Sequence, residues 1–197
     1  MGFPIIQLPE DILTTQEIIF KSKPDFIIDI GIAWGGGIML SASVLEMIGN
    51  GHVIGIDKTL PEHVYHEIMN SALSHRITLI RGDSTSDSVF SEVEKVIKKG
   101  SKVSLILDSN HEESHVYKEL CLYSSFVNKG QYITVYATAI DNLSAPSHRD
   151  WLWGKGNSPL SALNKFLDNT GRFEQDDFFR KKCLCSFAPS SRIKCVE

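Results

Sequence analysis

Residues 26–37, with the sequence FIIDIGIAWGGG, decide the fold of this chain. The first five are apolar except for Asp29, a pattern typical of a strand that is buried on both faces. The glycines that follow predict a tight turn into a helix, where unpaired backbone N–H groups can hold a nucleotide-like ligand. Asp29 would then meet a cationic or hydroxyl-bearing part of that ligand. We interpret the stretch as a cofactor-binding turn.

The spacing within this turn leaves other interpretations open. Gly31, Ala33 and Gly36 nearly fit the dinucleotide fingerprint G-x-G-x-x-G, which would favour an NAD-dependent oxidoreductase. A tight strand-to-helix connection in any α/β protein would also show this pattern. The turn alone therefore does not identify the cofactor.

Length and composition exclude several classes of protein. At 197 residues the chain can bury one core, so we expect a single domain over residues 1–197. The net charge of −4 and the scattered basic residues argue against binding to nucleic acid. No apolar run reaches the roughly eighteen residues of a membrane span, and the N-terminus does not resemble a signal peptide, so we expect a soluble, cytoplasmic protein. The cysteines form no C-x-x-C pair and are predicted to be reduced structural thiols: Cys121, Cys183, Cys185 and Cys195.

Predicted strands and helices alternate along the chain. This alternation implies a Rossmann-like α/β fold, with a mostly parallel sheet and helices on both faces. Beyond Asp141 the pattern changes to a long loop that contains Trp151 and Trp153. Ser158 and Pro159 then predict a helix start, and a strand hairpin is expected in the tail. The predicted strands are 26–30, 52–57, 76–82, 102–108, 131–138, 172–175 and 182–188, with a further candidate at 192–196, and the predicted helices are 12–21, 38–48, 61–73, 89–99, 112–127 and 158–168.

An acidic residue stands at or just beyond the end of each of four successive predicted strands. Asp57 would accept hydrogen bonds from ribose hydroxyls, and Asp83 from an exocyclic amine such as that of adenine. Asp29 would orient a charged amino group, and Asp108 would lie at the reacting end. The alternative is that these acids are helix caps and solvated turn residues.

These residues, taken with LDSNHEESHV at 107–116, resemble the cephalosporin hydroxylase and rhamnosyl O-methyltransferase family of S-adenosylmethionine-dependent methyltransferases. The similar pieces cover nearly the whole chain, from PEDILTTQEII through KPDFIIDIGIAWGGG, HVIGID, RITLIRGDS, LILDSNHEESHVYKEL and GNSPLSALNKFL to SFAPSSRIK. The resemblance implies a class I methyltransferase fold with a seven-stranded sheet that ends in an antiparallel hairpin. It also implies methyl transfer to an oxygen, commonly of a sugar in lipid or glycan assembly, with a divalent metal and a homo-oligomer.

The resemblance further assigns residues to the parts of S-adenosylmethionine. The turn would hold the methionine part, Asp57 the ribose, and Asp83 with Ser84 the adenine. Asp108 would be a metal ligand. The turn residues concerned are Gly31, Ala33, Gly35, Gly36 and Gly37.

The chain departs from the family pattern at the expected metal site. Where family members follow the fifth strand with Glu-Asp-Thr, this sequence has Tyr136, Ala137 and Thr138. Mg²⁺ prefers several hard oxygen ligands, so Asp108 alone provides too few of them, unless Asp141 turns back to replace the lost acids. The family's Gly-Gly-Ser is Gly-Gly-Gly here, which removes a hydroxyl at position 37 that could contact the cofactor carboxylate.

Two histidines follow Asp108 at the predicted start of a helix. His111 matches the family's histidine and could act as the general base for the acceptor hydroxyl, with His115 nearby as a further catalytic candidate. The alternatives are that both imidazoles cap and pack the helix, or that they bind zinc with Asp108. Trp151 and Trp153 could stack on a sugar.

Three functions from different classes are consistent with the sequence. The first is an S-adenosylmethionine-dependent O-methyltransferase that acts on a hydroxyl of a sugar, glycolipid or natural product. The second is a binding protein that keeps the cofactor site but has lost catalysis with its metal acids, as Tyr136 and Ala137 would explain. The third is an NAD-dependent oxidoreductase, which the predicted hairpin tail and Asp83 disfavour.

Overall fold

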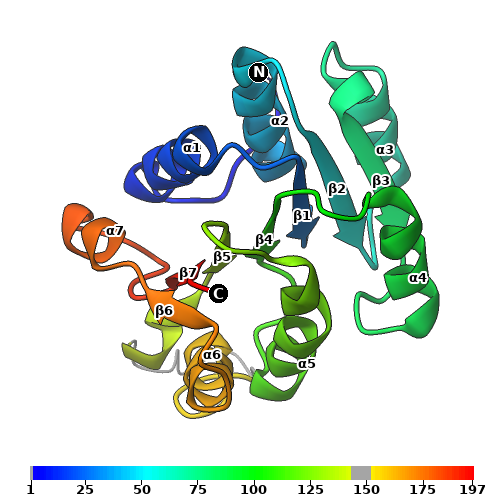
Figure 1. Ribbon diagram of the computed structural model, residues 1–197. Coiled ribbons are helices and arrows are strands. Elements are labelled where there is room, and N and C mark those ends of the chain that lie inside the picture. The colour runs from blue at the N-terminus through cyan, green and yellow to red at the C-terminus, as the bar shows by residue number, and fades with distance from the viewer. Residues whose placement is uncertain (1, 143–151) are drawn as a thin grey trace.

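The computed structural model describes residues 2–142 and 152–197, and a seven-stranded sheet lies at its centre (Figure 1). The strand order is β3-β2-β1-β4-β5-β7-β6. Strands β1 to β5 are parallel, whereas β7 runs antiparallel to both β5 and β6, as the predicted fold class requires. The strands are β1 (Phe26–Ile30), β2 (His52–Asp57), β3 (Ile77–Arg81), β4 (Val103–Leu107), β5 (Tyr132–Val135), β6 (Phe173–Gln175) and β7 (Arg192–Cys195).

Helices cover both faces of the sheet, and two hydrophobic clusters show which helix packs on which face. The first cluster joins the sheet to α4, α5 and α6, and the second joins it to α1, α2 and α3. Phe179 of the short α7 packs with Ile18 of α1 and Tyr132 of β5. The helices are α1 (Pro9–Ser22), α2 (Gly36–Ile48), α3 (Glu62–Met69), α4 (Asp87–Val96), α5 (Glu113–Tyr123), α6 (Pro159–Asp168) and α7 (Asp177–Lys182).

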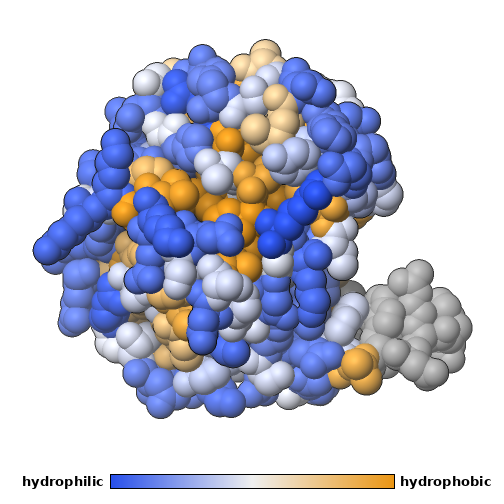
Figure 2. Space-filling model, turned by 90° about the vertical axis from the view of Figure 1, so that its right-hand side faces the viewer, coloured by the Kyte–Doolittle hydropathy of each residue, from blue (hydrophilic) through white to orange (hydrophobic). Residues whose placement is uncertain are grey.

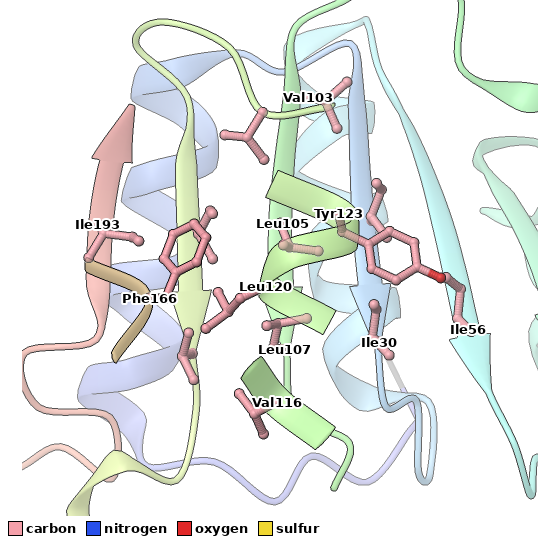
Figure 3. Packing of buried hydrophobic residues seen from close by; sticks show 14 of the residues in the cluster. Ile30, Ile56, Val103, Leu105, Leu107, Val116, Leu120, Tyr123, Phe166 and Ile193 are labelled. Carbon is pink, nitrogen blue, oxygen red and sulfur yellow. The ribbon is translucent and has the colours of Figure 1, made fainter. Parts of the chain in front are cut away.

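Alternating side chains of β1 divide the strand between these two cores. Ile28 and Ile30 lie in the cluster that includes α5, and Figure 3 shows Ile30 together with Leu120 of that helix. Ile27 lies in the opposite cluster. Because successive strand residues point to opposite faces, Asp29 shares the face of Ile27. Burying each of these isoleucine side chains contributes about 1.5–3 kcal/mol, so the sequence of β1 fixes which face Asp29 occupies.

The N-terminal helix starts earlier than the sequence suggested. The predicted helix spans 12–21, but α1 begins at Pro9, because proline suits the first helical turn. The hydroxyl of Thr14 donates to the Glu10 carbonyl at 2.7 Å inside the helix. Likewise, α2 begins at Gly36 instead of residue 38, and α3 ends at Met69 instead of residue 73.

The predicted strand at 182–188 is wrong. Residues 183–188 form a loop that follows α7, a helix that the sequence did not predict. The Asp176 carboxylate accepts hydrogen bonds from the N–H groups of Phe178 and Phe179 and so caps this helix. The hairpin partner of β6 is β7, the further candidate at 192–196. The helix predicted from Ser158 is confirmed, because the Ser158 hydroxyl caps α6 by accepting from the N–H of Ser161.

The fifth strand is shorter than predicted. It ends at Val135, although the N–H of Tyr136 still donates to the Leu107 carbonyl of β4 at 2.9 Å. Ala137 then takes a φ of 58°, a left-handed conformation that stops an extended strand. The chain continues as a 3₁₀ helix at Thr138–Asn142.

The sheet is bounded on one side by β3, which has a neighbour on only one side. Figure 2 views the molecule from the side that carries α3, β3 and α4, and shows an apolar band in the middle of a largely hydrophilic surface.

Within the described ranges, no helix combines the length and the apolar character needed to cross a membrane. All four cysteines are free, as expected.

Candidate functional site

Two adjoining cavities lie at the carboxyl ends of the parallel strands, where open α/β sheets hold their ligands. We call them the small cavity, of about 60 Å³, and the large cavity, of about 640 Å³. Gly31, Ala33 and Asp108 line both, so the cavities meet at the glycine turn. Of the other predicted site residues, Gly35 lines neither cavity, and the rest divide between them. The small cavity is lined by Asp29, Gly36 and Gly37, and the large one by Asp57, Asp83, Ser84, His111 and His115.

Gly31 is required where the turn leaves β1. Its φ is 98°, and a Cβ atom there would lie 2.2 Å from the carbonyl oxygen of Asp108. Gly36 is equally confined, because a Cβ atom would meet the Pro4 carbonyl oxygen at 2.2 Å. At Gly37 a Cβ atom would meet only the Gln7 amide, at 3.9 Å, so this glycine is not forced by space. The first two glycines therefore let neighbouring backbones approach the turn.

The N-terminus of α2 opens at this turn. Gly35, with a φ of 87°, precedes the helix, and no side chain in the described part of the chain caps it. The first N–H groups of the helix are thus free to bind an anionic ligand group. Two further polar atoms at the small cavity, Oε1 of Gln7 and Oγ of Ser41, are buried without a hydrogen-bond partner among the described residues. Buried atoms of this kind call for an explanation, and a polar ligand would satisfy them.

Asp57 shapes the turn from the end of β2. Its Oδ2 accepts from the backbone N–H groups of Ile32 and Ala33 at 2.9 and 3.2 Å, and its Oδ1 from that of Thr59 at 2.7 Å. A carboxylate has about four acceptor positions, so these bonds occupy most of them. The predicted ribose contacts would share or replace the bonds to Thr59.

Asp83 forms the far side of the large cavity. Its Oδ1 accepts from the N–H and hydroxyl of Thr85, and its Oδ2 from the ammonium of Lys58 at 3.0 Å. The Thr85 hydrogen bonds, followed by that from Lys58, hold the pKa of Asp83 well below its usual range. Asp83 therefore stays ionised as an acceptor at the cavity wall.

Asp29 is the predicted site residue whose environment differs most from expectation. It lies within β1 instead of at its end, with 5% of its surface exposed. Burial, and secondarily the charge of Asp108, raises the pKa of Asp29 to about 8. A carboxylate with this environment favours a cationic group in the small cavity, because a nearby positive charge would stabilise its ionised form.

The raised pKa of Asp29 predicts that stability falls as pH rises. Between the ordinary pKa of 3.8 and about 8, the folded protein keeps a proton that the unfolded chain has lost. From pH 5 to pH 8, the free energy of unfolding should therefore decrease by about 1–3 kcal/mol relative to Asp29→Asn, which carries no titrating proton. Urea unfolding of both proteins across this range measures the difference. Parallel pH profiles would show that Asp29 ionises normally.

His111 lies beside Asp108 at the junction of the cavities. Its Nε2 atom is 3.6 Å from Oδ1 of Asp108, too long for a hydrogen bond, and is buried without a hydrogen-bond partner among the described residues. The imidazole packs edge-on against the ring of Trp153, with 5.0 Å between ring centres. Trp151 lies outside the described residues. His111, Asp108 and Trp153 therefore lie together at the wall of the large cavity.

His115 belongs to a buried network that the sequence did not reveal. Its Nε2 lies 3.1 Å from Oε1 of Glu119, which also accepts from the hydroxyls of Ser84 at 2.5 Å and Ser109 at 2.7 Å. Hydrogen bonding to Glu119 raises the pKa of His115, although partial burial opposes the shift. The spacing of His115 and Glu119, one helical turn apart, is the sequence signal that could have identified this pair.

The residues present do not fit the divalent metal that the resemblance implied. The Tyr136 side chain is 3% exposed, and its hydroxyl lies 2.6 Å from that of Thr15. Burial raises the pKa of Tyr136, so it stays a neutral phenol, which is a poor substitute for a carboxylate ligand. Asp141 instead accepts from the N–H of Gly156 at 3.3 Å. The part of the chain that the structure describes contains no group of three or more His, Cys, Asp or Glu side chains that could hold a metal.

The strand order, the antiparallel hairpin and the large cavity at the glycine turn together define a class I methyltransferase fold. The chain belongs to the rhamnosyl O-methyltransferase/CmcI family, whose sequence profile matches residues 1–196. It is 23% identical over 172 residues to a rhamnosyl O-methyltransferase of Mycobacterium tuberculosis (strain H37Rv), which covers 85% of this chain and 65% of the relative. The chain thus spans just under two thirds of the length of these curated relatives.

Solved structures show the same fold. CmcI with Mg and SAM superposes with a TM-score of 0.67 at 14% identity, covering 100% of this chain and 75% of that one. The O-methyltransferase TomG from Streptomyces achromogenes, in complex with SAM, gives a TM-score of 0.65 at 11% identity over 98% of this chain and 82% of that one. At this level of identity the likeness concerns the fold alone.

Proposed function

We propose that this protein is an S-adenosylmethionine-dependent O-methyltransferase that acts on a sugar hydroxyl without a divalent metal. The observation that carries the proposal is the position of His111. Its unpaired Nε2 lies 3.6 Å from Asp108, the residue at which the two cavities meet. The family assignment favours this activity over an NAD-dependent oxidoreductase.

The small cavity suits the methionine end of this cofactor. The uncapped N-terminus of α2 can bind its carboxylate, and the Ser41 hydroxyl can replace the hydroxyl that the family has at position 37. The unpaired Oε1 of Gln7 can accept from its ammonium group, with Asp29 close by. Asp57 and Asp83 then lie along the large cavity, where ribose and adenine would extend.

The chemistry needs a base and a fixed geometry. S-Adenosylmethionine supplies a methyl group on a positively charged sulfur, which is a good leaving group. His111 would take the proton of the acceptor hydroxyl at Nε2 as the oxygen forms its bond to the methyl carbon and the carbon–sulfur bond breaks. The products are the methyl ether, the neutral thioether and a protonated imidazole, whose charge the Asp108 carboxylate stabilises. The walls of the cavities hold the reacting groups in line.

The acceptor side of the large cavity contains an aromatic and an aliphatic side chain. Trp153 lines it beside His111, together with Leu152, whose side chain is largely exposed at 80%. An indole ring can pack against the C–H face of a sugar while a neighbouring polar group orients its hydroxyls. The curated relatives are named for a rhamnosyl acceptor, so we propose a deoxysugar residue of a glycolipid or similar glycoside.

The proposal predicts activity that does not depend on a metal. Purified protein should bind S-adenosylmethionine and methylate a rhamnoside, and adding EDTA should change kcat by less than about twofold, because the residues at the site provide one carboxylate where Mg²⁺ needs several ligands. Calorimetry with the cofactor and mass spectrometry of a panel of glycosides measure both steps. Restoration of a lost activity by Mg²⁺ would contradict the metal-free route.

A second candidate function follows from the same departure at Tyr136 and Ala137. A protein that lost its metal acids could retain the cofactor cavity as a binding site alone. The same panel separates the two candidates, since this second function predicts cofactor binding with no methylated product from any glycoside, with or without Mg²⁺.

A further inference from the structure

A carboxylate beneath the large cavity gathers three donors. The Glu119 side chain is fully buried, at 0% exposure, although it lies on a helix that is elsewhere partly solvated. Its Oε1 accepts from the hydroxyl of Ser84 at 2.5 Å, from that of Ser109 at 2.7 Å and from Nε2 of His115 at 3.1 Å. Both serines and the histidine line the large cavity, whereas Glu119 itself does not.

The hydrogen-bond capacity of the two serines decides what they present to a ligand. A hydroxyl has one proton to donate and two lone pairs that accept. Because Ser84 and Ser109 both direct their proton to Glu119, only lone pairs remain on each oxygen, and Nε2 of His115 lies 3.3 Å from that of Ser84. A ligand edge that approaches these two oxygens must therefore donate a hydrogen bond.

From this geometry we infer that Glu119 is a positioning residue that selects a purine with an exocyclic amine, by keeping the hydroxyls of Ser84 and Ser109 as acceptors. The inference rests on the proposed function, which places a nucleoside in this cavity. Adenine presents an amino group at position 6, whereas hypoxanthine presents a carbonyl oxygen there. Two acceptor oxygens facing that carbonyl would lose a hydrogen bond and meet a repulsive partner.

Neighbouring groups fix the Ser84 loop and the imidazole of His115 beside Glu119. The backbone carbonyl of Ser84 accepts from the Tyr123 hydroxyl at 2.7 Å, which fixes the loop that carries this serine. His115 has a raised pKa, mainly because of its hydrogen bond to Glu119, with smaller contributions from the charge of Asp83 against that of Lys58.

The test compares binding of S-adenosylhomocysteine with that of its inosine counterpart, which differs at position 6 of the base. The wild-type protein should prefer the adenine form. In Glu119→Met, a side chain of similar length with almost no accepting ability, the serine hydroxyls are free to donate, and the preference should fall about tenfold. Ser109→Ala, at an exposed position where folding is not at risk, should also reduce it. Calorimetry gives both dissociation constants for each protein.

The matched control is Glu113→Met, the same exchange earlier in α5, where the carboxylate pairs with Lys165 outside the cavity. Its preference should equal that of the wild type. An unchanged preference in a folded Glu119→Met or in Ser109→Ala would overturn the inference while leaving the proposed function intact. If the wild-type protein binds neither compound, the proposed function fails, and the inference fails with it.

Discussion

Replacing Asp11 by alanine should lower the free energy of unfolding by about 3–5 kcal/mol, because the change leaves the Arg192 guanidinium buried without its counter-charge. The two side chains are 0% and 2% exposed, and Nη2 of Arg192 donates to Oδ1 of Asp11 at 2.6 Å. The carboxylate also accepts from the N–H of Phe187 at 2.9 Å. One buried acid thus ties α1 to β7 and to the loop before it. Urea unfolding of both proteins measures the loss.

The control for this prediction is Glu17→Ala, which removes another ion pair between α1 and the C-terminal tail. Glu17 pairs with Lys182 at the surface, where each side chain is 43% exposed. A solvated pair of this kind contributes about 0–1 kcal/mol, so the variant should unfold nearly as the wild type does. If Asp11→Ala and Glu17→Ala lowered the free energy of unfolding by similar amounts, burial would not be the reason for the large contribution of the Asp11 pair.

The central sheet could be predicted from the sequence, because its signals are local. An apolar run such as that of β1, followed by glycines, identifies a buried strand and its turn within a few residues. Ser158 and Pro159 likewise marked the start of α6 correctly. Such patterns depend on neighbouring residues, and no distant part of the chain has to be known.

Neither α7 nor the ion pair between Asp11 and Arg192 could be predicted in this way. The segment that forms α7 has too few apolar residues to show the spacing typical of a helix. Its structure depends on the capping residue Asp176. Asp11 and Arg192 lie 181 positions apart, and each would pass for a surface charge when considered alone. Their pairing depends on how α1 packs beside β7, which only the folded structure reveals.

The candidate site was predictable in its residue types but not in their protonation or partners. The sequence suggested that four acids would lie along one edge of the sheet. Asp57, Asp83 and Asp108 line the large cavity, whereas Asp29 lines the small one. The sequence did not show that Asp29 is buried on the other face of β1, where its pKa rises, because burial depends on what α1 and α2 place above it. Glu119 was missed because one helical acid resembles any other until its depth is known.

Replacing His111 by glutamine should lower kcat for methyl transfer by about 10²- to 10⁴-fold, because a neutral amide cannot take the proton of the acceptor hydroxyl. The side chain lines the large cavity beside Asp108, and its Nε2 is buried and unpaired among the described residues, so the imidazole is not engaged in holding the fold through that atom. Binding of S-adenosylmethionine should therefore change little. Single-turnover kinetics and calorimetry measure the two quantities separately.

The kinetic constants distinguish a base from a residue that only shapes the cavity. Loss of a base should lower kcat and leave KM and cofactor affinity nearly unchanged, whereas a change in the shape of the cavity should alter all three. His66→Gln, which changes an imidazole that is 62% exposed on α3, should retain the wild-type rate. If His111→Gln keeps kcat within about threefold, proton removal passes to water or to the Asp108 carboxylate, and orientation within the cavity must supply most of the acceleration.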